Sequence, residues 1–226
     1  EDDDILSNPI KSETLSNFSE FISRIVVDTN LTPNRKLTEQ QAHELPCNIR
    51  YAILIASRIF SLGQVMEFEY TWPNGDKIRY EQDLKELLFD DYHQSPTEEE
   101  LNAKPFAVPY YPFGNTKNFT ITLQSGKEVS YSLLTGKGEA MMMNTPVKTK
   151  NLELKARDLK LKVEDKWETV QSFALFSPRD MAEIRKSVAE NDPYYTGLIE
   201  LEHPTKGYKA GFSIMGTPDF FYIAGY

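Results

Sequence analysis

The sequence is poor in the residues that most often carry chemistry. It holds one cysteine, Cys47, and three histidines among 226 residues. A single cysteine can form neither an intramolecular disulfide nor a cysteine-based zinc site, so we expect a chain suited to a reducing, cytosolic compartment. No His-x-x-x-His pair or clustered carboxylate spacing is present, and the runs of acidic residues are typical of solvated faces. We therefore predict no metal site and no cofactor.

Catalytic motifs are missing as well. His43, His93 and His203 are far apart in the sequence, and no Gly-x-Ser-x-Gly elbow accompanies them. The stretch LLTGKGEA lacks the spacing and the Lys-Ser/Thr ending of a phosphate-binding loop. We predict no catalytic residue and no enzymatic activity. The alternative is a hydrolase that uses scattered histidines and carboxylates, which a deep pocket joining two histidines to an acid would favour.

Positive charge and long apolar runs are also scarce. The chain carries 25 Lys and Arg against 34 Asp and Glu, a formal net charge of −9. Nucleic-acid affinity comes mainly from clustered Lys and Arg on phosphates, so nucleic acid is not an expected partner. No run of eighteen apolar residues is present, and we predict no membrane span. The start of the chain has no signal-like segment. Because the chain begins at Glu1 and not at a methionine, we expect it to start after a removed or disordered piece.

The hydrophobic content of 40% is sufficient to fill a core, and its patterning predicts helices and hairpins. Apolar residues at helical spacing predict an amphipathic helix over 14–27, and Thr38 with Gln41 forms a capping-box pattern. A break at Pro46 precedes a helix over 48–62 that is apolar around most of its circumference, as in a helix buried on several sides. Ser177 followed by Pro178 predicts the start of another helix, which should end near residue 190.

Alternating apolar residues separated by turn residues predict three hairpins. Their turns lie at 73–76, 124–127 and 204–207, and a short helix is expected to begin at Asp83 after the first of them. The stretch 152–163 also alternates, with a one-residue slip near Asp158 that predicts a bulge or turn. GEAMMMN predicts a helix. Helices and strands do not alternate regularly, so the predicted class is α+β, with several β-hairpins and no doubly wound parallel sheet.

A proline-rich segment over 90–118 suggests a binding loop or a domain boundary. On that basis we predict an acidic arm with a short amphipathic helix over 1–33, a helix-hairpin-helix subdomain over 34–105, and a hairpin-rich α+β subdomain over 106–226. A small helix at TEEEL is expected inside the proline-rich segment.

Three stretches of the chain together resemble a known protein family. They are LPCNIRYAILIASRIFSLGQVMEFEYTWPNGDKIRYEQDLKELL, FTITLQSGKEVSYSLLTGKGEA and FSPRDMAEIRKSVAENDPYYTGLIELEHPTKGYKAGFSIMGTPDFF. In this order they resemble the T-even-type baseplate protein family of contractile-tailed bacteriophages, over roughly residues 38–226. Members of that family often carry Cys-Pro-x-Cys-Gly knuckles at the hairpin tips, where this chain has WPNG and HPTKG. The resemblance implies that the hairpin after the apolar helix is a structural knuckle without a metal, whose tip is closed by its turn residues alone. Such a hairpin braces the apolar helix or presents a lip to a neighbouring subunit.

The resemblance further implies a non-enzymatic structural protein of a phage-type contractile tail, located in the baseplate or hub of the virion and in the host cytoplasm during assembly. Its expected partners are other tail subunits in a symmetric hetero-oligomeric assembly, contacted through the N-terminal arm and the proline-rich loop. An assembly chaperone absent from the mature particle is the alternative. Because aromatic residues dominate interface energetics, the expected contact residues are Phe18, Ile22, Trp72, Tyr110, Tyr111, Phe113, Phe220 and Phe221.

Overall fold

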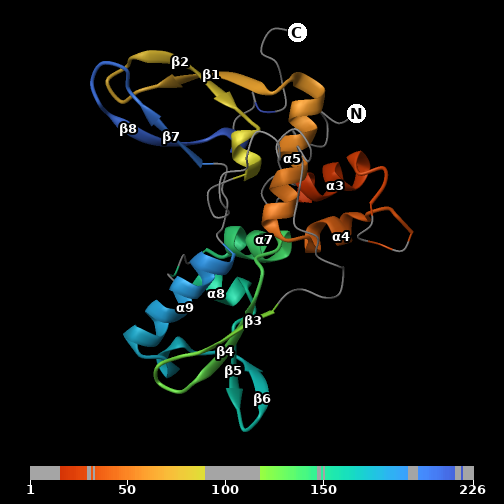
Figure 1. Ribbon diagram of the computed structural model, residues 1–226, viewed down its shortest axis with the longest axis vertical. Coiled ribbons are helices and arrows are strands. Elements are labelled where there is room, and N and C mark those ends of the chain that lie inside the picture. Colours follow the sequence, from red (N-terminus) through yellow and green to blue (C-terminus); the bar gives the residue numbers. More distant parts are fainter. Residues whose placement is uncertain are drawn as a thin grey trace. The chain divides into compact units, whose positions relative to one another are not determined.

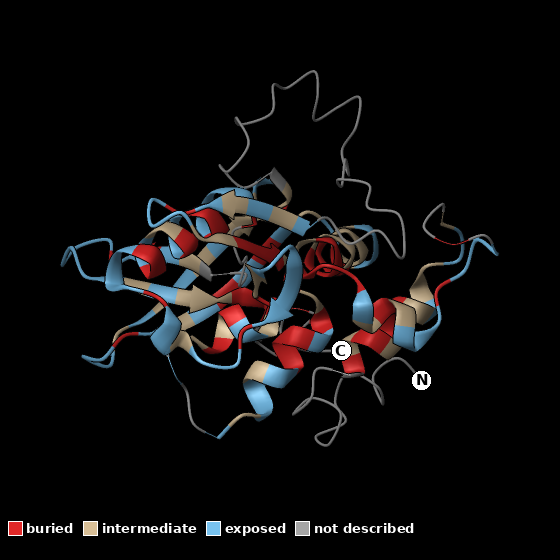
Figure 2. Ribbon diagram, turned by 90° about the horizontal axis from the view of Figure 1, so that it is seen from below, coloured by how far each residue is buried: buried red, intermediate tan, exposed pale blue. Residues whose placement is uncertain are grey.

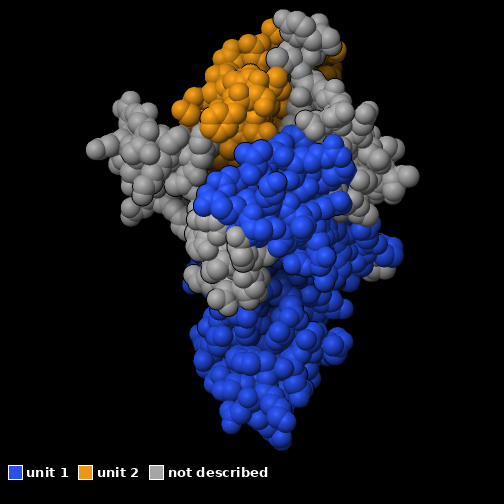
Figure 3. Space-filling view, turned by 90° about the vertical axis from the view of Figure 1, so that its right-hand side faces the viewer, with its two compact units in different colours: residues 1–50, 109–194 blue, residues 51–108, 195–226 orange. Residues whose placement is uncertain are grey.

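The computed structural model describes residues 16–29, 32, 34–89, 118–146, 149, 151–192, 198–216 and 220. The chain forms two compact units (Figure 3). Unit 1 contains Glu1–Arg50 and Pro109–Tyr194, and unit 2 contains Tyr51–Val108 and Tyr195–Tyr226. The predicted boundaries at 33 and 105 differ from this division, because the hairpin near the C-terminus joins the hairpin after the apolar helix. The proline-rich segment and the helix expected at TEEEL lie outside the described residues.

Among the described residues, three helices lie in the first part of the chain. Helix α3 spans Ser16–Ile25 and packs against α4, which spans Glu39–Glu44. The predicted capping box at the start of α4 is confirmed, because the Thr38 side chain accepts from the backbone N–H of Gln41 and the Gln41 side chain accepts from that of Thr38. Helix α5 spans Cys47–Leu62 and passes from unit 1 into unit 2. None of its residues from 47 to 59 is exposed, as its apolar circumference predicted.

Unit 1 contains a four-stranded antiparallel sheet in the order β3-β4-β5-β6 (Figure 1). Its strands are β3 (Asn118–Thr122), β4 (Glu128–Ser132), β5 (Lys160–Val163) and β6 (Lys166–Thr169). Helices α7 (Gly136–Asn144) and α8 (Leu152–Ala156) lie between β4 and β5 in the chain, and a 3-10 turn, η2 (Phe173–Leu175), precedes α9 (Pro178–Asn191). The predicted hairpin with its turn at 124–127 and the helix at GEAMMMN are both confirmed.

The strand predicted from residue 152 onward is wrong for its first five residues, which form α8. Leu152 and Leu154 are both buried, so an alternating pattern this short also fits a single helical turn. The helix ends at Ala156 with Arg157 as its C-cap, and Asp158 takes a positive φ of 50°. A turn therefore lies where the slip in the pattern predicted one, and the strand begins only at Lys160.

The core of unit 1 lies between the sheet and α9. Val129 and Tyr131 of β4 meet Ile184 and Val188 of α9 in one hydrophobic cluster. The buried residues of α9 lie on one face of the helix. Figure 2 shows buried and exposed stretches alternating along helices and strands of the chain. Ser177 caps α9 through a capping box with Asp180 and has Pro178 beside it, as predicted.

Unit 2 contains two antiparallel hairpins. One consists of β1 (Val65–Thr71) and β2 (Lys77–Asp83), and the other of β7 (Leu198–Glu202) and β8 (Lys209–Ser213). The helix expected from Asp83 is shorter than predicted: β2 extends to Asp83, and a 3-10 turn, η1, covers Glu86–Phe89. Another 3-10 turn, η3 (Ile214–Gly216), follows β8. The α+β class is confirmed, and of the described helices none is long and apolar enough to cross a membrane.

The core position of Ile184 gives a direct test of the packing of unit 1. Ile184 is fully buried, so Ile184→Ala should lower the free energy of unfolding by about 2–5 kcal/mol through lost burial and the cavity left behind. Urea unfolding followed by circular dichroism measures the change. Ala189→Ser, at an exposed position of the same helix, is the control and should change stability by less than about 0.5 kcal/mol.

Candidate functional site at the paired hairpin tips

The two hairpins of unit 2 meet through aromatic side chains. The ring of Phe68 on β1 stacks on Phe212 of β8, with 4.5 Å between ring centroids and 6° between planes. Tyr70 meets the same Phe212 ring edge-on at 5.7 Å. Phe68 and Tyr70 both come from the alternating pattern of β1, which places them on one face of the hairpin. The apolar face that the pattern predicted is therefore covered by the other hairpin.

The indole of Trp72 closes the space between the two tips. It contacts the imidazole of His203 at 5.2 Å and the ring of Tyr208 at 6.3 Å, centroid to centroid. Its Nε1–H donates to the hydroxyl of Tyr80 at 3.0 Å, and that hydroxyl donates to the carbonyl oxygen of Glu202 at 3.1 Å. Trp72 and His203 are both buried, so the tip has a small aromatic core of its own.

Asp76 links the two tips by charge. Its Oδ2 accepts from Nε2 of His203 at 3.1 Å, from Nζ of Lys206 at 2.7 Å and from Nδ2 of Asn74 at 2.8 Å. Hydrogen bonds from Lys206, Asn74 and His203 hold the pKa of Asp76 at about 2, below its ordinary value of 3.8. Two of these donors belong to the other hairpin, so the carboxylate is a bridge between two turns.

Each tip also closes by its own backbone hydrogen bonds. Trp72 N–H donates to the carbonyl oxygen of Asp76 at 2.8 Å, and His203 N–H donates to that of Tyr208 at 2.8 Å. Gly75 and Gly207 both take the positive φ that these turns require. The turn chemistry expected from WPNG and HPTKG is present, and the side chains from the opposite tip add to it.

The His203–Asp76 pair resembles the base and orienting acid of a hydrolase. However, both ring nitrogens of His203 already have hydrogen-bond partners. Nε2 faces Asp76, and Nδ1 accepts the backbone N–H of Thr205 at 3.2 Å. A general base needs a nitrogen that faces the proton it removes. Because His203 is also buried, this arrangement supports packing rather than proton transfer.

His43 and Ser19 form a second contact of catalytic type, in unit 1. The Ser19 hydroxyl lies 3.0 Å from Nδ1 of His43 and accepts from Nη1 of Arg50 at 2.9 Å. Burial, followed by the charge of Arg50, lowers the pKa of His43. Ser19 is fully buried between α3 and its neighbours, so its hydroxyl is not open to a substrate. His93 lies outside the described residues.

Two further groups that could carry chemistry, Cys47 and Arg50, are buried in unit 1. Burial raises the pKa of the Cys47 thiol well above its ordinary value, which keeps it protonated and unreactive. The guanidinium of Arg50 lies so close to Gly136 that a Cβ there would sit 2.5 Å from Cζ of Arg50, so this glycine of LLTGKGEA makes room for a side chain. Within the described ranges, no three His, Cys, Asp or Glu side chains come together as a metal site.

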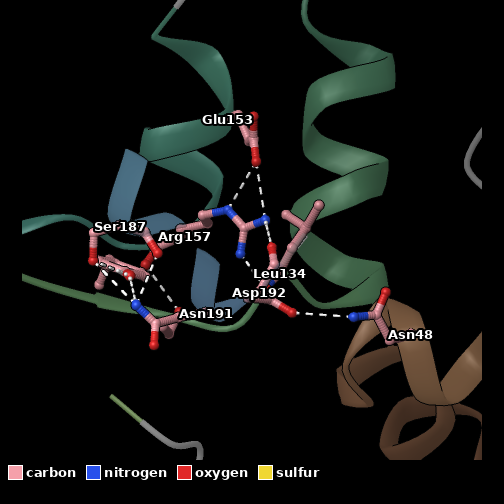
Figure 4. A network of polar contacts seen from close by, with 9 residues as sticks. Asn48, Leu134, Glu153, Arg157, Ser187, Asn191 and Asp192 are labelled. Atoms are coloured by element: carbon pink, nitrogen blue, oxygen red, sulfur yellow. Dashed lines mark hydrogen bonds and ion pairs between the residues drawn. The ribbon is translucent and has the colours of Figure 1, made fainter. Parts of the chain in front are cut away.

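A buried polar network lies in unit 1 (Figure 4). Nη1 of Arg157 pairs with the carboxylate of Asp192, and Nη2 donates to the carbonyl oxygen of Asp192 at 3.0 Å. The same carboxylate accepts the backbone N–H of Leu134 at 2.8 Å and Nδ2 of Asn48 at 3.3 Å. Glu153 accepts from the other side of the guanidinium. These contacts join the ends of α8 and α9 to the start of α5, and we assign the network a structural role.

The expected contact residues have three different outcomes. Ile22, Trp72 and Phe220 are fully or almost fully buried within the chain itself. Phe18 on α3 is half-buried. Tyr110, Tyr111, Phe113 and Phe221 lie outside the described residues. Sequence reasoning did not pair Asp76 with His203 and Lys206, because the only signal in the sequence was the presence of polar residues at both turns.

No family model, no curated protein and no solved structure matches this chain.

The charge bridge at the tips predicts a pH-dependent stability. The folded pKa of Asp76, about 2, lies below its ordinary 3.8, so its carboxylate stabilises the folded state above about pH 4 and loses this effect as pH falls toward 2. Asp76→Asn should therefore lower the thermal midpoint of unit 2 at pH 7 and leave it nearly unchanged at pH 2. Glu81→Gln, an exposed carboxylate of the same hairpin, is the control. An equal difference at both pH values would contradict the bridge.

The buried pair of unit 1 predicts a larger effect. Arg157→Met leaves the Asp192 carboxylate buried without its cation, which should cost about 3–5 kcal/mol in the free energy of unfolding. Urea unfolding measures it. Arg185→Met, on the exposed side of α9, removes an arginine that only donates to Asn151 and should cost less than about 1 kcal/mol. Similar losses of unfolding free energy in both variants would show that burial of the Asp192 carboxylate does not depend on its pairing with Arg157.

Proposed function

We propose that this chain is a structural component of a phage-type contractile-tail baseplate or hub and acts through protein contacts. In this proposal the paired tips form a rigid lip, defined by Trp72, Asp76, His203, Lys206 and Tyr208, which a neighbouring subunit contacts. The N-terminal arm and the proline-rich segment supply further contacts.

The observation that carries the proposal is the closure of the two tips on each other. The sequence resemblance aligns these turns with metal-binding knuckles, and here Asp76 joins them through His203 and Lys206. In a knuckle, a metal ion holds the turn in place. Here an aromatic contact and an ion pair hold together two turns that are distant in the sequence. Such a tip supports a contact surface of fixed shape, which is what binding without large rearrangement requires.

The engagement of the described histidines supports a role without bond-making chemistry. His43 contacts Ser19 and His203 contacts Asp76, and Ser19 and His203 are both buried. Neither offers a nucleophile and a base that face one open position, as catalysis needs. The assembly chaperone, one of the alternative functions, makes the same protein contacts as a structural component. The structural component stays in the finished particle, and the chaperone does not.

Mass spectrometry of purified tails and particles, with the tagged full chain as bait in infected cells, tests the proposal. A structural component is expected in the particle at a fixed ratio to other tail proteins. A chain that is bound to tail subassemblies but missing from the particle supports the chaperone instead. Absence from both overturns the proposal.

A variant of the lip makes the test specific. Tyr208 is half exposed at the tip, so Tyr208→Ala should weaken retention of the tail partner by roughly tenfold or more, the scale of an aromatic contact residue. Leu175→Ala, which removes an equally exposed apolar side chain in unit 1, is the matched control and should retain the partner. Equal retention by both variants would mean that the tips are not the contact surface.

A further inference from the structure

The tip of the first hairpin of unit 2 carries an asparagine followed directly by a glycine. Asn74 and Gly75 are both exposed, in the turn between β1 and β2. Every other asparagine of the chain is followed by a residue with a side chain. Gly75 has a positive φ of 87°, and a Cβ built on it would meet nothing within 4 Å. Water therefore reaches the peptide bond that joins these two residues.

An Asn-Gly pair brings a nucleophile close to an electrophile. A bond between the backbone nitrogen of Gly75 and the side-chain Cγ of Asn74 closes a five-membered ring. A side chain on the second residue hinders this ring closure, and glycine has none. Asn-Gly is also a pair that tight hairpin turns favour, because both residues tolerate positive φ. The residues that close the tip are therefore also those most open to loss of a side-chain amide.

The folded tip engages both reacting groups. The N–H of Gly75 donates to the carbonyl oxygen of Trp72 at 2.8 Å. Nδ2 of Asn74 donates to Oδ2 of Asp76 at 2.8 Å, and Oδ1 of Asn74 accepts the backbone N–H of Asp76 at 3.2 Å. The same Asp76 oxygen accepts from Nζ of Lys206 on the other hairpin at 2.7 Å. Ring closure therefore requires the turn to open, and the bridge between the hairpins controls how often it opens.

Loss of the amide reverses the contact between Asn74 and Asp76. An aspartate at position 74 replaces a donor to the Asp76 carboxylate by a second carboxylate, and like charges at such a distance repel each other. An isoaspartate also lengthens the main chain by one carbon atom, so the N–H of Gly75 no longer matches the carbonyl oxygen of Trp72. Either product weakens the turn that carries the bridge.

We propose that Asn74 is a site of spontaneous deamidation and that this modification separates the two tips. The Gly75 nitrogen gives its proton to hydroxide and bonds to Cγ of Asn74. The Cγ–Nδ2 bond breaks, and Nδ2 takes a proton from water and leaves as ammonia. Water then adds to either carbonyl of the succinimide ring and breaks a ring C–N bond, which gives aspartate or isoaspartate. The reaction consumes water, releases ammonia and needs no oxidant or reductant.

Mass spectrometry of the purified full chain, incubated at neutral to mildly alkaline pH and then digested, tests the site. The mass change from amide to acid should accumulate at Asn74, faster at higher pH, and isoaspartate should be among the products. Asn34, exposed but followed by Arg35, is the internal control and should react at least about tenfold more slowly. The chain unfolded in guanidinium chloride gives the rate of the open turn. An unchanged Asn74 in the folded chain, after the unfolded chain has reacted, overturns the proposal.

A variant of the other hairpin tests whether the bridge controls the reaction. Lys206→Met leaves residues 72–76 unchanged and removes a donor to Asp76, so deamidation of Asn74 should become roughly two- to fivefold faster, the scale of one exposed ion pair. Lys209→Met removes the same charge from the same hairpin, where Lys209 pairs with Glu200, and should leave the rate unchanged. Equal rates in the two variants would mean that the bridge does not protect Asn74.

The effect of the product is measured with Asn74→Asp. This variant should lower the thermal midpoint of unit 2 at neutral pH, because it places a second carboxylate beside Asp76. Asn34→Asp is the matched control, since its carboxylate still accepts the backbone N–H of Lys36, and it should leave the midpoint unchanged. A midpoint in Asn74→Asp equal to that of the unmodified chain contradicts separation of the tips. The inference goes beyond the proposed function and does not rest on it, because every measurement uses the chain alone.

Discussion

The carboxylate of Asp76 is the contact on which unit 2 depends. It pairs with His203, 127 residues further along the chain, and with Lys206 beside it. Two-stranded hairpins are marginally stable alone, so each needs a surface to cover its apolar face. The stacking of Phe68 on Phe212 supplies that surface, and the bridge at Asp76 fixes the register in which the two hairpins meet. A lip of defined shape follows from these two contacts together.

In unit 1, a buried ion pair joins segments that are distant in the sequence. Arg157 and Asp192 are the C-caps of α8 and α9, where a helix leaves its last carbonyl groups without intrahelical partners. Asp192 satisfies the N–H of Leu134 as well as the guanidinium, so one carboxylate serves several elements.

Local features of the fold were predictable from the sequence because they depend on neighbouring residues. The capping boxes at Thr38 and Ser177 need residues three positions apart, and both are present. The turns at Gly75 and Gly126 need a residue that tolerates positive φ. Residues 152–156 were misassigned because a five-residue alternation of apolar side chains fits a buried helical turn equally well. The short segment had no signal that decided between the two.

By itself, the sequence determined the α+β class, the positions of the hairpins and the scarcity of groups for metal or acid-base chemistry. Only the tertiary structure decided that the first and last hairpins share one unit, and hence that Trp72 is a core residue of the tips. It also decided which charges are paired. The physical reason is that hydrogen bonds within a turn depend on adjacent residues, whereas burial and ion pairing depend on side chains that the chain brings together from far apart.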